Sequence, residues 1–447
     1  MAQEMVGWAY NELASVNLGD VRRNKRAKRL LTRFAEKPTA SIPHACHNWA
    51  ETLGAYRFME NSTFEWRDIM RPHWERTCER MREHEVVLCI QDTTVLDFNG
   101  QEASGLGPLN FETQRGMFLH PTYAVSTDRV GLGVLDAWMW AREPKDSDGN
   151  RGGIKESTRW IEGYERVAEL AVQLPGTRLV YVADREADIA ALMQRAIELG
   201  TPADWLIRST HNRNLDGDKK LWATVLNTES VGEIEFIMAA RPGQKARRVK
   251  QALYVKRVTQ RCGLKVTCVI AKEIDPPKGG NPVEWRLLTN REPAGQDDLV
   301  ALIDWYRARW EIEIFFHVLK NGCHVQALQL SSVDRIERAL ALLMIVAWRI
   351  AYLMHMGRTC PDLDASLFFD QDEIRGAYLL MKKQRPSHPP RLNDMVLLVA
   401  QCGGFLARKS DGEPGAKTIW KGLLRVMTAA ETIRALRDEG ALNMSSV

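Results

Sequence analysis

Apolar and polar positions along the chain fall into stretches of different periodicity. In the first eighty residues apolar positions recur at helical spacing, and residues 20–37 combine one apolar face with basic residues on the other faces. Pro38 ends this predicted helix, and a second helix is predicted over residues 48–59. The chain is therefore predicted to begin with helices, one of them strongly basic.

Short apolar runs replace this pattern in the middle of the chain. They predict strands at residues 86–90, 123–125, 130–140 and 179–183, with helices at 156–174 and 187–199. Strands that alternate with covering helices are typical of a mixed α/β sheet.

A β-rich segment follows, in which Gly, Pro and Asn or Asp turns separate the strands. These strands are predicted at residues 205–209, 232–238, 251–258, 264–271 and 285–289. Because helices are predicted again at 297–320 and 333–356, we interpret residues 205–292 as an insertion in the α/β domain. The last ninety residues are predicted to be mostly helical.

Composition limits the class of protein. The 447 residues are 45% apolar with a net charge of +4, which favours a folded chain of roughly two to four domains. The longest apolar stretch, residues 339–356, contains Arg349 and is interpreted as a buried helix rather than a membrane span. Because the N-terminus has no secretory pattern, we expect the protein in the cytoplasm, away from membranes.

Several ligand motifs are disfavoured by spacing. The eight cysteines show no C-x-x-C pairs, which argues against a disulfide framework and a zinc ribbon. His44, Cys46 and His47 are metal-ligand types, but no second ligand pair lies near them in the sequence, so a zinc site is not expected there. No phosphate-binding Gly-x-x-x-x-Gly-Lys-Ser/Thr loop is present, so no nucleotide cofactor is expected.

The small net charge conceals two basic segments. Residues 20–37 hold eight bases and two acids, residues 241–261 hold eight bases and no acid, and the remainder carries −10. Two such segments suggest a polyanion that is bound in two places. The alternative, two solvated surface segments, is equally open.

Candidate chemistry begins with the predicted helix at residues 297–320. At about 100° per residue, one narrow face of this helix carries four residues, namely Tyr306, Arg309, Glu313 and Lys320. The apolar residues of the helix form a separate stripe. The alternative is a solvated face with an ordinary Arg–Glu pair one turn apart.

Two further carboxylates each follow an apolar strand. Asp92 and Asp184 would project from the edge of a sheet, where ligands bind in open α/β folds. The alternatives are turn formation with Thr93 for Asp92, and helix capping for Asp184. With Glu313 they would supply three mutually repelling carboxylates, which favour oxygen-binding cations such as Mg²⁺ or Mn²⁺. Two such ions could activate a water or hydroxyl against a phosphodiester.

Three segments that carry these residues resemble the signatures of one enzyme family. They are IQDTT at residues 90–94, ADREADI at 183–189, and the spacing Tyr-x-x-Arg-x-x-x-Glu-x-x-x-x-x-x-Lys over 306–320. The chain resembles the DDE cut-and-paste transposases of bacterial insertion sequences, above all the Tn-five transposase. The resemblance covers most of the chain and is weakest after about residue 360.

The resemblance implies an RNase H-like catalytic domain at residues 69–358, with the β-rich insertion at about 205–292. It also implies a helical DNA-end-binding domain at 1–68 and a helical C-terminal dimerisation domain at 359–447. Asp92, Asp184 and Glu313 would be the catalytic residues and would hold two Mg²⁺ or Mn²⁺ ions. The implied DNA-binding residues are Tyr306, Arg309, Lys320, Trp285, Arg208, Arg22, Arg23, Lys25, Arg26, Tyr56 and Arg57.

The implied function is cut-and-paste transposition by metal-dependent cleavage, hairpin formation and strand transfer. The partners would be double-stranded element ends, target DNA and a second copy of the chain, at the nucleoid of a bacterial cell. Trp285 would stack on a base flipped from the hairpin, for which the alternative is a core or interface aromatic. Two other functions stay open: a metal-dependent endonuclease without strand joining, and a catalytically silent DNA-binding regulator. The presence of all three acids argues against the regulator.

Overall fold

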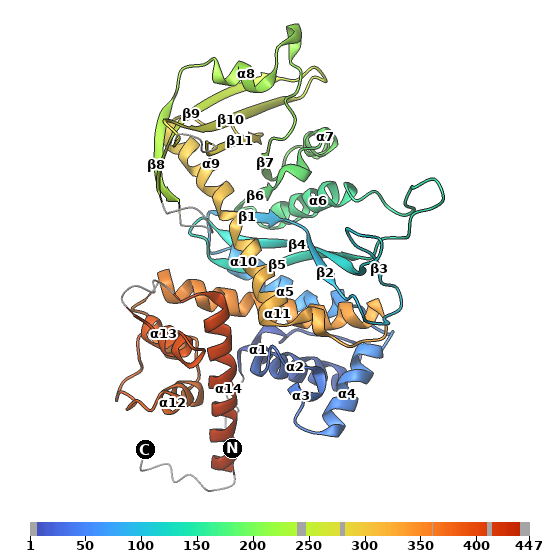
Figure 1. Cartoon of the computed structure of the whole chain (residues 1–447), viewed down its shortest axis with the longest axis vertical. Helices are drawn as coiled ribbons and strands as arrows, with labels where there is room; N and C mark the ends of the chain where they lie inside the picture. Colours follow the sequence, from blue (N-terminus) through green and yellow to red (C-terminus); the bar gives the residue numbers. More distant parts are fainter. Residues whose placement is uncertain (1–6, 239–246, 278–281, 360, 409–413, 439–447) are drawn as a thin grey trace.

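The N-terminal part of the chain is helical, as predicted. The computed structural model describes residues 7–238, 247–277, 282–359, 361–408 and 414–438. Before the first strand it contains α1 (Trp8–Glu12), α2 (Val21–Glu36), α3 (Ile42–Ala45), α4 (Trp49–Glu60) and α5 (Trp66–Met81) (Figure 1). The basic helix α2 begins after Asp20, whose carboxylate accepts a hydrogen bond from the Arg22 N–H, and its apolar face is buried.

A mixed sheet forms the centre of the molecule, and this confirms the predicted α/β character. Its first strands are β1 (Val86–Gln91), β2 (Thr94–Asp97), β3 (Gly107–Pro108), β4 (Arg115–Ser126), β5 (Gly131–Trp140), β6 (Arg178–Ala183) and β7 (Asp204–Arg208). Strand β1 runs antiparallel to β4 and parallel to β6, β4 is antiparallel to β5, and β6 is parallel to β7. Both β1 and β6 are almost wholly buried, which explains their continuous apolar sequences.

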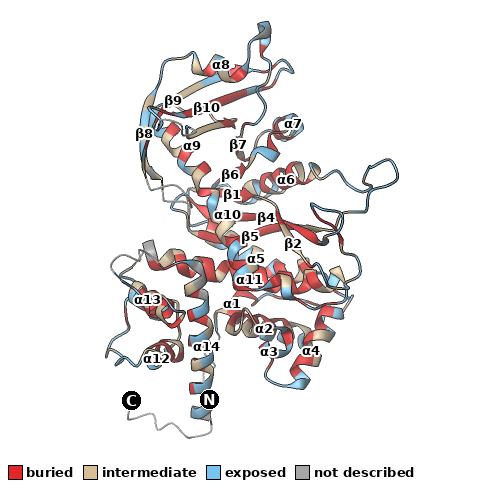
Figure 2. Cartoon of the chain, in the orientation of Figure 1, coloured by how far each residue is buried: buried red, intermediate tan, exposed pale blue. Residues whose placement is uncertain are grey.

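Helices cover both faces of this sheet, and the strands between them are buried (Figure 2). On one face lie α6 (Thr158–Gln173), the 3₁₀ helix η1 (Arg185–Ala187) and α7 (Ala190–Glu198). The predicted helix at 187–199 is thus two elements. On the other face lie α5 and the long helix α11 (Val333–Thr359), both in contact with β5.

The β-rich segment extends the same sheet. Strand β11 (Glu284–Thr289) pairs antiparallel with β7, and β10 (Lys265–Glu273), β9 (Arg247–Thr259) and β8 (Gly232–Met238) follow outward in that order. The 3₁₀ helix η2 (Asp216–Asp218) and helix α8 (Leu221–Leu226) precede β8. Each of these strands lies at or close to its predicted position.

The predicted helix at 297–320 is interrupted. It consists of α9 (Gln296–Ala308), α10 (Trp310–His317) and a π-helical turn η3 (Val318–Gly322), with Arg309 between the first two; η4 (Val325–Ala327) follows. Among the described helices, α11 alone has the length and apolar character of a membrane span. However, 72% of its most apolar window is buried within the protein, which fits the predicted core helix.

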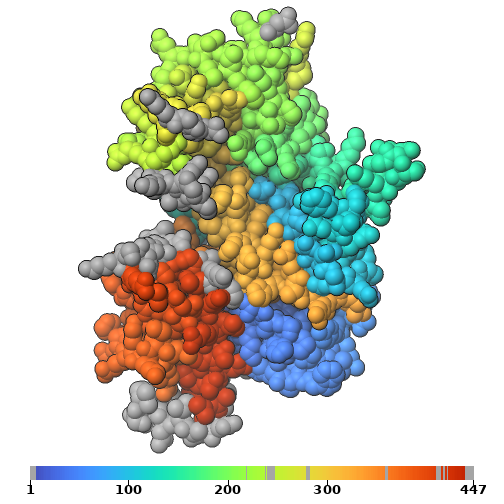
Figure 3. Space-filling view, viewed as in Figure 1, coloured from blue at the N-terminus to red at the C-terminus, as the bar shows by residue number. Residues whose placement is uncertain are grey.

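The C-terminal elements are η5 (Ala365–Leu367), α12 (Gln371–Leu380), α13 (Leu392–Cys402) and α14 (Ala416–Asp438). Helix α14 packs against α12 and α13 and also contacts α2. The space-filling view shows the C-terminal helices in red beside the N-terminal helices in blue, with the β-rich segment at the opposite end (Figure 3).

Candidate active site

The strand register brings two of the predicted carboxylates together. Strands β1 and β6 are parallel, and Gln91 pairs with Ala183. Asp92 and Asp184 are the next residues of the two strands, so they follow neighbouring strands at the same edge of the sheet. The Thr93 N–H donates to Asp92 Oδ1 at 2.8 Å, as the turn interpretation predicted. The capping interpretation is wrong for Asp184, because its side chain accepts no hydrogen bond from η1.

The segment from α9 to α10 connects both strand ends to Glu313. Arg309 donates from Nη1 to Asp92 Oδ2 at 2.5 Å and from Nη2 to Glu313 Oε1 at 2.9 Å. The Tyr306 hydroxyl donates to Asp184 Oδ1 at 3.2 Å. The expected Arg–Glu pair is therefore present, but the same guanidinium also binds a carboxylate 217 positions away in the sequence. One arginine thus bridges two of the three predicted acids.

The three acids carry more charge than the one arginine that bridges two of them. Burial raises the pKa of Asp92 from 3.8 to about 6; Arg309 opposes this rise, and the charges of Asp184 and Glu313 add to it. Burial also raises the pKa of Tyr306 to about 12, with a further contribution from Asp184, so its hydroxyl stays a donor at neutral pH. The group as a whole carries more negative charge than Arg309 neutralises.

The donor set fits hard divalent cations. All three acids offer carboxylate oxygens, without the sulfur or imidazole ligands that would favour zinc. In the part of the chain that the structure describes, these oxygens do not all lie within 4.8 Å of one another. The three carboxylates therefore span more than the ligand sphere of one ion in the present arrangement.

Lys320 lies in the π turn η3 rather than in a continuous α-helix. A π turn contains more residues than an α turn, so the 100° per residue on which the prediction rested does not hold at Lys320. Burial lowers the pKa of its ammonium group, and no carboxylate among the described residues offsets this effect. A half-buried amine without a counter-ion is suited to receive an anion.

Trp285 lies on β11, where one face of its ring is covered. It stacks on Phe236 of β8 with a centroid distance of 5.3 Å and 19° between the ring planes. The Arg307 guanidinium lies 4.8 Å from the Phe236 centroid and 6.0 Å from that of Trp285. Trp285 is half-buried and belongs to an aromatic pair, which is one of the two environments expected for it.

A cavity of about 290 Å³ lies beside Asp184, and the sequence analysis missed most of it. Arg208 lines it, with its Nη1 3.9 Å from Asp184 Oδ1. The other lining residues are Arg185, Ser209, Thr210, Trp222, Glu284 and Arg286. Three arginines against one glutamate make this cavity a candidate phosphate-binding surface. Arg286 adjoins Trp285 in the sequence, and Arg185 lies within the quoted ADREADI segment, so part of the signal was present.

The predicted DNA-binding residues of the N-terminal region lie on α2 and α4, which contact each other. Arg22, Lys25 and Arg57 are exposed, whereas Arg23, Arg26 and Tyr56 are half-buried. Gly54 of α4 leaves the space that the Arg26 guanidinium occupies, because a Cβ there would overlap it. The six residues therefore belong to one pair of packed helices.

The second basic segment is largely neutralised. Across the strand pairs, Lys250 binds Glu233 at 2.5 Å and Arg248 binds Glu235 at 3.2 Å. Arg247 also pairs with Glu273, and Arg257 with Glu292. Arg241 and Lys245 lie outside the described residues. In the described part of this segment, acids on neighbouring strands and just after β11 therefore face four of the bases, and binding of a polyanion there stays a prediction.

Comparison with known proteins finds three parts of the chain that match transposase families. Residues 5–64 match the family described as Transposase DNA-binding, residues 164–349 match the Transposase DDE domain, and residues 345–441 match the Transposase Tn5 dimerisation domain. The DDE match includes Asp184 and Glu313 but begins after Asp92.

Among solved structures, a piggyBac transposase synaptic complex with hairpin DNA aligns at 9% sequence identity. The alignment covers 99% of this chain and 83% of that one, with a TM-score of 0.40, which is too low to indicate a shared fold. The three family matches together show that the chain is an enzyme that acts on DNA, and that it belongs to the DDE transposases as a relative of the Tn5 transposase.

Proposed function

We propose that this protein catalyses cut-and-paste transposition, and that Asp92, Asp184 and Glu313 form its catalytic centre. One observation carries the proposal: parallel strands place Asp92 and Asp184 side by side, and Arg309 joins Asp92 to Glu313. The strand order β5-β4-β1-β6-β7, with its two parallel pairs, supports an RNase H-like catalytic domain at residues 69–358.

The carboxylate chemistry supports two Mg²⁺ or Mn²⁺ ions as cofactors. When bound, two such ions supply activation of a water or a 3′-hydroxyl and stabilisation of the leaving oxygen of a phosphodiester. The chain itself supplies the oxygen donors and their orientation. Thr93 fixes one oxygen of Asp92, and the Tyr306 hydroxyl fixes one oxygen of Asp184. Burial raises the pKa of Asp92 and the charges of Asp184 and Glu313 add to this rise, so a bound cation would favour its ionised form.

The surroundings of the triad support binding of a DNA strand end. Lys320 and the arginine-lined cavity at Arg208 offer cations for backbone phosphates, and Tyr306 and Arg309 lie directly at the acids. Release of the element through a hairpin requires an unstacked base, and an aromatic ring such as that of Trp285 can receive such a base. We therefore assign Trp285 to stacking on that base.

The flanking helices support the remaining roles. We assign residues 1–68 to recognition of the element ends, with the contacts made by Arg22, Arg23, Lys25, Arg26, Tyr56 and Arg57. We assign residues 359–447 to pairing two copies of the chain on DNA. With these roles we expect the protein to act at the nucleoid of a bacterial cell.

The test is a cleavage assay on linear DNA that carries the inverted repeats flanking the gene, in Mg²⁺. We expect nicked, hairpin and joined products with the unaltered protein, and none with Asp92→Asn or Glu313→Gln. Trp285→Ala should still nick the DNA but form less hairpin, because only hairpin formation needs the unstacked base. Glu102→Gln, which changes an exposed acid away from the triad, serves as the matched control.

Each other outcome has a definite meaning. Undiminished cleavage by Asp92→Asn or Glu313→Gln would refute the triad. Free ends without joined products would favour the endonuclease, and DNA binding without any cleavage would favour the regulator.

A further inference from the structure

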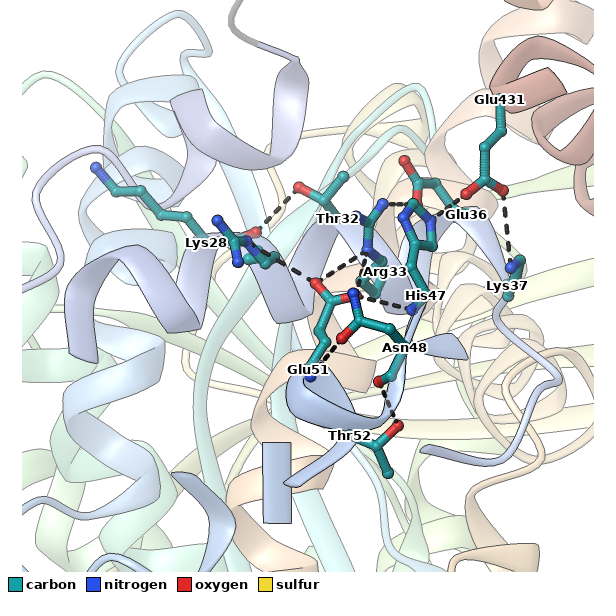
Figure 4. A network of polar contacts seen from close by, with 11 residues as sticks. Lys28, Thr32, Arg33, Glu36, Lys37, His47, Asn48, Glu51, Thr52 and Glu431 are labelled. Carbon is teal, nitrogen blue, oxygen red and sulfur yellow. Dashed lines mark hydrogen bonds and ion pairs between the residues drawn. The ribbon is translucent and has the colours of Figure 1, made fainter. Parts of the chain in front are cut away.

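Three metal-ligand side chains meet at a place other than the active centre. Glu36 lies in the last turn of α2, His47 follows α3, and Glu431 lies on α14. One ligand atom of each lies within 4.8 Å of the other two, and in the described part of the chain no other such group of three occurs. Figure 4 shows the His47 ring close to both carboxylates.

Each carboxylate is oriented by a cation of its own. Arg33 donates from Nη1 to Glu36 Oε2 at 2.8 Å, and the Lys37 ammonium lies 3.7 Å from Glu431 Oε2. The other oxygen of Glu431 faces His47 Nε2. Such outer contacts hold carboxylate ligands in place in metal sites and leave one oxygen for the metal.

The position of His47 is fixed through its backbone. Its N–H donates to Glu51 Oε2 at 2.8 Å, and Glu51 also accepts a hydrogen bond from Arg33 Nε at 3.3 Å (Figure 4). Because Arg33 also holds Glu36, one arginine sets the relative positions of two of the three ligands.

We propose that Glu36, His47 and Glu431 bind one Zn²⁺ ion. An imidazole nitrogen with two carboxylate oxygens favours zinc over Mg²⁺, which prefers oxygen alone. Ligand atoms of a tetrahedral zinc site lie roughly 3.4 Å apart, so small side-chain rotations bring the present group into range. The side chains are 12%, 36% and 25% exposed, which leaves access for the ion and for a water as fourth ligand.

A zinc site at His47 was not expected from the sequence, because no second ligand pair lies near it in the chain. Folding supplies one ligand from α2 and one from the far end of the chain. A bound ion would fasten α14 to α2 and to the loop that follows α3, so it would join the region matching the dimerisation domain to the DNA-binding region.

The test is equilibrium dialysis of the full chain against Zn²⁺ in excess Mg²⁺, with bound zinc counted by mass spectrometry. Excess Mg²⁺ keeps the oxygen-only acids of the active centre occupied. We expect one zinc per chain that is lost in both His47→Ala and Glu431→Gln. His44→Ala is the matched control, since this neighbouring histidine lies outside the group, and it should retain the zinc.

Thermal unfolding provides a second measurement. Zn²⁺ should raise the midpoint of the unaltered chain and of His44→Ala, but not that of Glu431→Gln, whose Gln side chain preserves the shape of the position. No zinc uptake, or equal uptake by the unaltered chain and both ligand variants, would overturn the proposal and leave a hydrogen bond between His47 and Glu431.

Discussion

Replacing Asp92 by Asn is expected to stabilise the protein even though it removes the proposed catalytic function. In the folded chain the pKa of Asp92 is about 6 against an ordinary 3.8, chiefly because the carboxyl is buried. Its ionised form is therefore less favourable in the folded chain than in the unfolded chain. Asn is neutral and similar in shape, so it avoids this cost.

The magnitude follows from the difference between the two pKa values. At 1.36 kcal/mol per pKa unit, the difference of roughly two units corresponds to about 3 kcal/mol in the free energy of unfolding. This value is an upper limit, because Arg309 loses a charged partner in the variant. The penalty develops as the pH rises through the window from 3.8 to about 6, since the folded pKa is the higher one. We therefore expect a gain of at most about 3 kcal/mol at pH 8 and about half of that gain at pH 5.

The assay is thermal unfolding in EDTA at both pH values, with Glu102→Gln as control. For a chain of this length the gain corresponds to a midpoint roughly 3 to 5 °C higher at pH 8. In added Mg²⁺ the difference should shrink, because only the unaltered chain keeps all three proposed ligands. A midpoint in EDTA at pH 8 that is unchanged or lower, or a gain at pH 5 as large as at pH 8, would refute this reasoning.

Two other predictions concern the cations of the site. Arg309→Met should lower the unfolding midpoint in EDTA, because Asp92 and Glu313 lose their shared partner, and adding Asp92→Asn should restore the midpoint. The double-mutant cycle of these two substitutions should give a coupling energy of about 1–3 kcal/mol. Strictly additive effects on stability would contradict the ion pair between Arg309 and Asp92. Lys320→Met should reduce the slope of log K for DNA against log salt by about 0.9, the value for one phosphate contact, in anisotropy titrations, whereas Lys155→Met on an exposed loop should leave the slope unchanged.

Local sequence patterns were sufficient for most of the strands. Strand β8 begins at Gly232, as its sequence predicted, and the structure describes it as far as Met238. Strands β2 and β3 were missed, since four and two residues are too short to form a recognisable apolar run. The break at Arg309 and the π turn after it were also missed, because backbone irregularities of this kind leave no periodic signal.

Strand register and contacts between distant segments determine which of the predicted site residues lie together, and local sequence patterns do not contain this information. That Asp92 and Asp184 both follow strands was readable, but their adjacency depends on the pairing of β1 with β6. The basic residues of β9 looked unpaired in the sequence because their partners, such as Glu233 and Glu273, lie on neighbouring strands. A charge count along the chain therefore overestimated the basic surface.

Burial is the chief cause of the raised pKa of Asp92, and the neighbouring acids, one of which shares Arg309 with it, add to the rise. A single guanidinium is shared by two carboxylates while a third lies nearby, and the pKa of Asp92 stays raised in spite of it. The site thus keeps an excess of negative charge, which costs folding free energy and at the same time attracts divalent cations. The cost and the proposed activity therefore depend on the same three acids, and we expect a variant that removes the cost to lose the proposed metal-dependent chemistry as well.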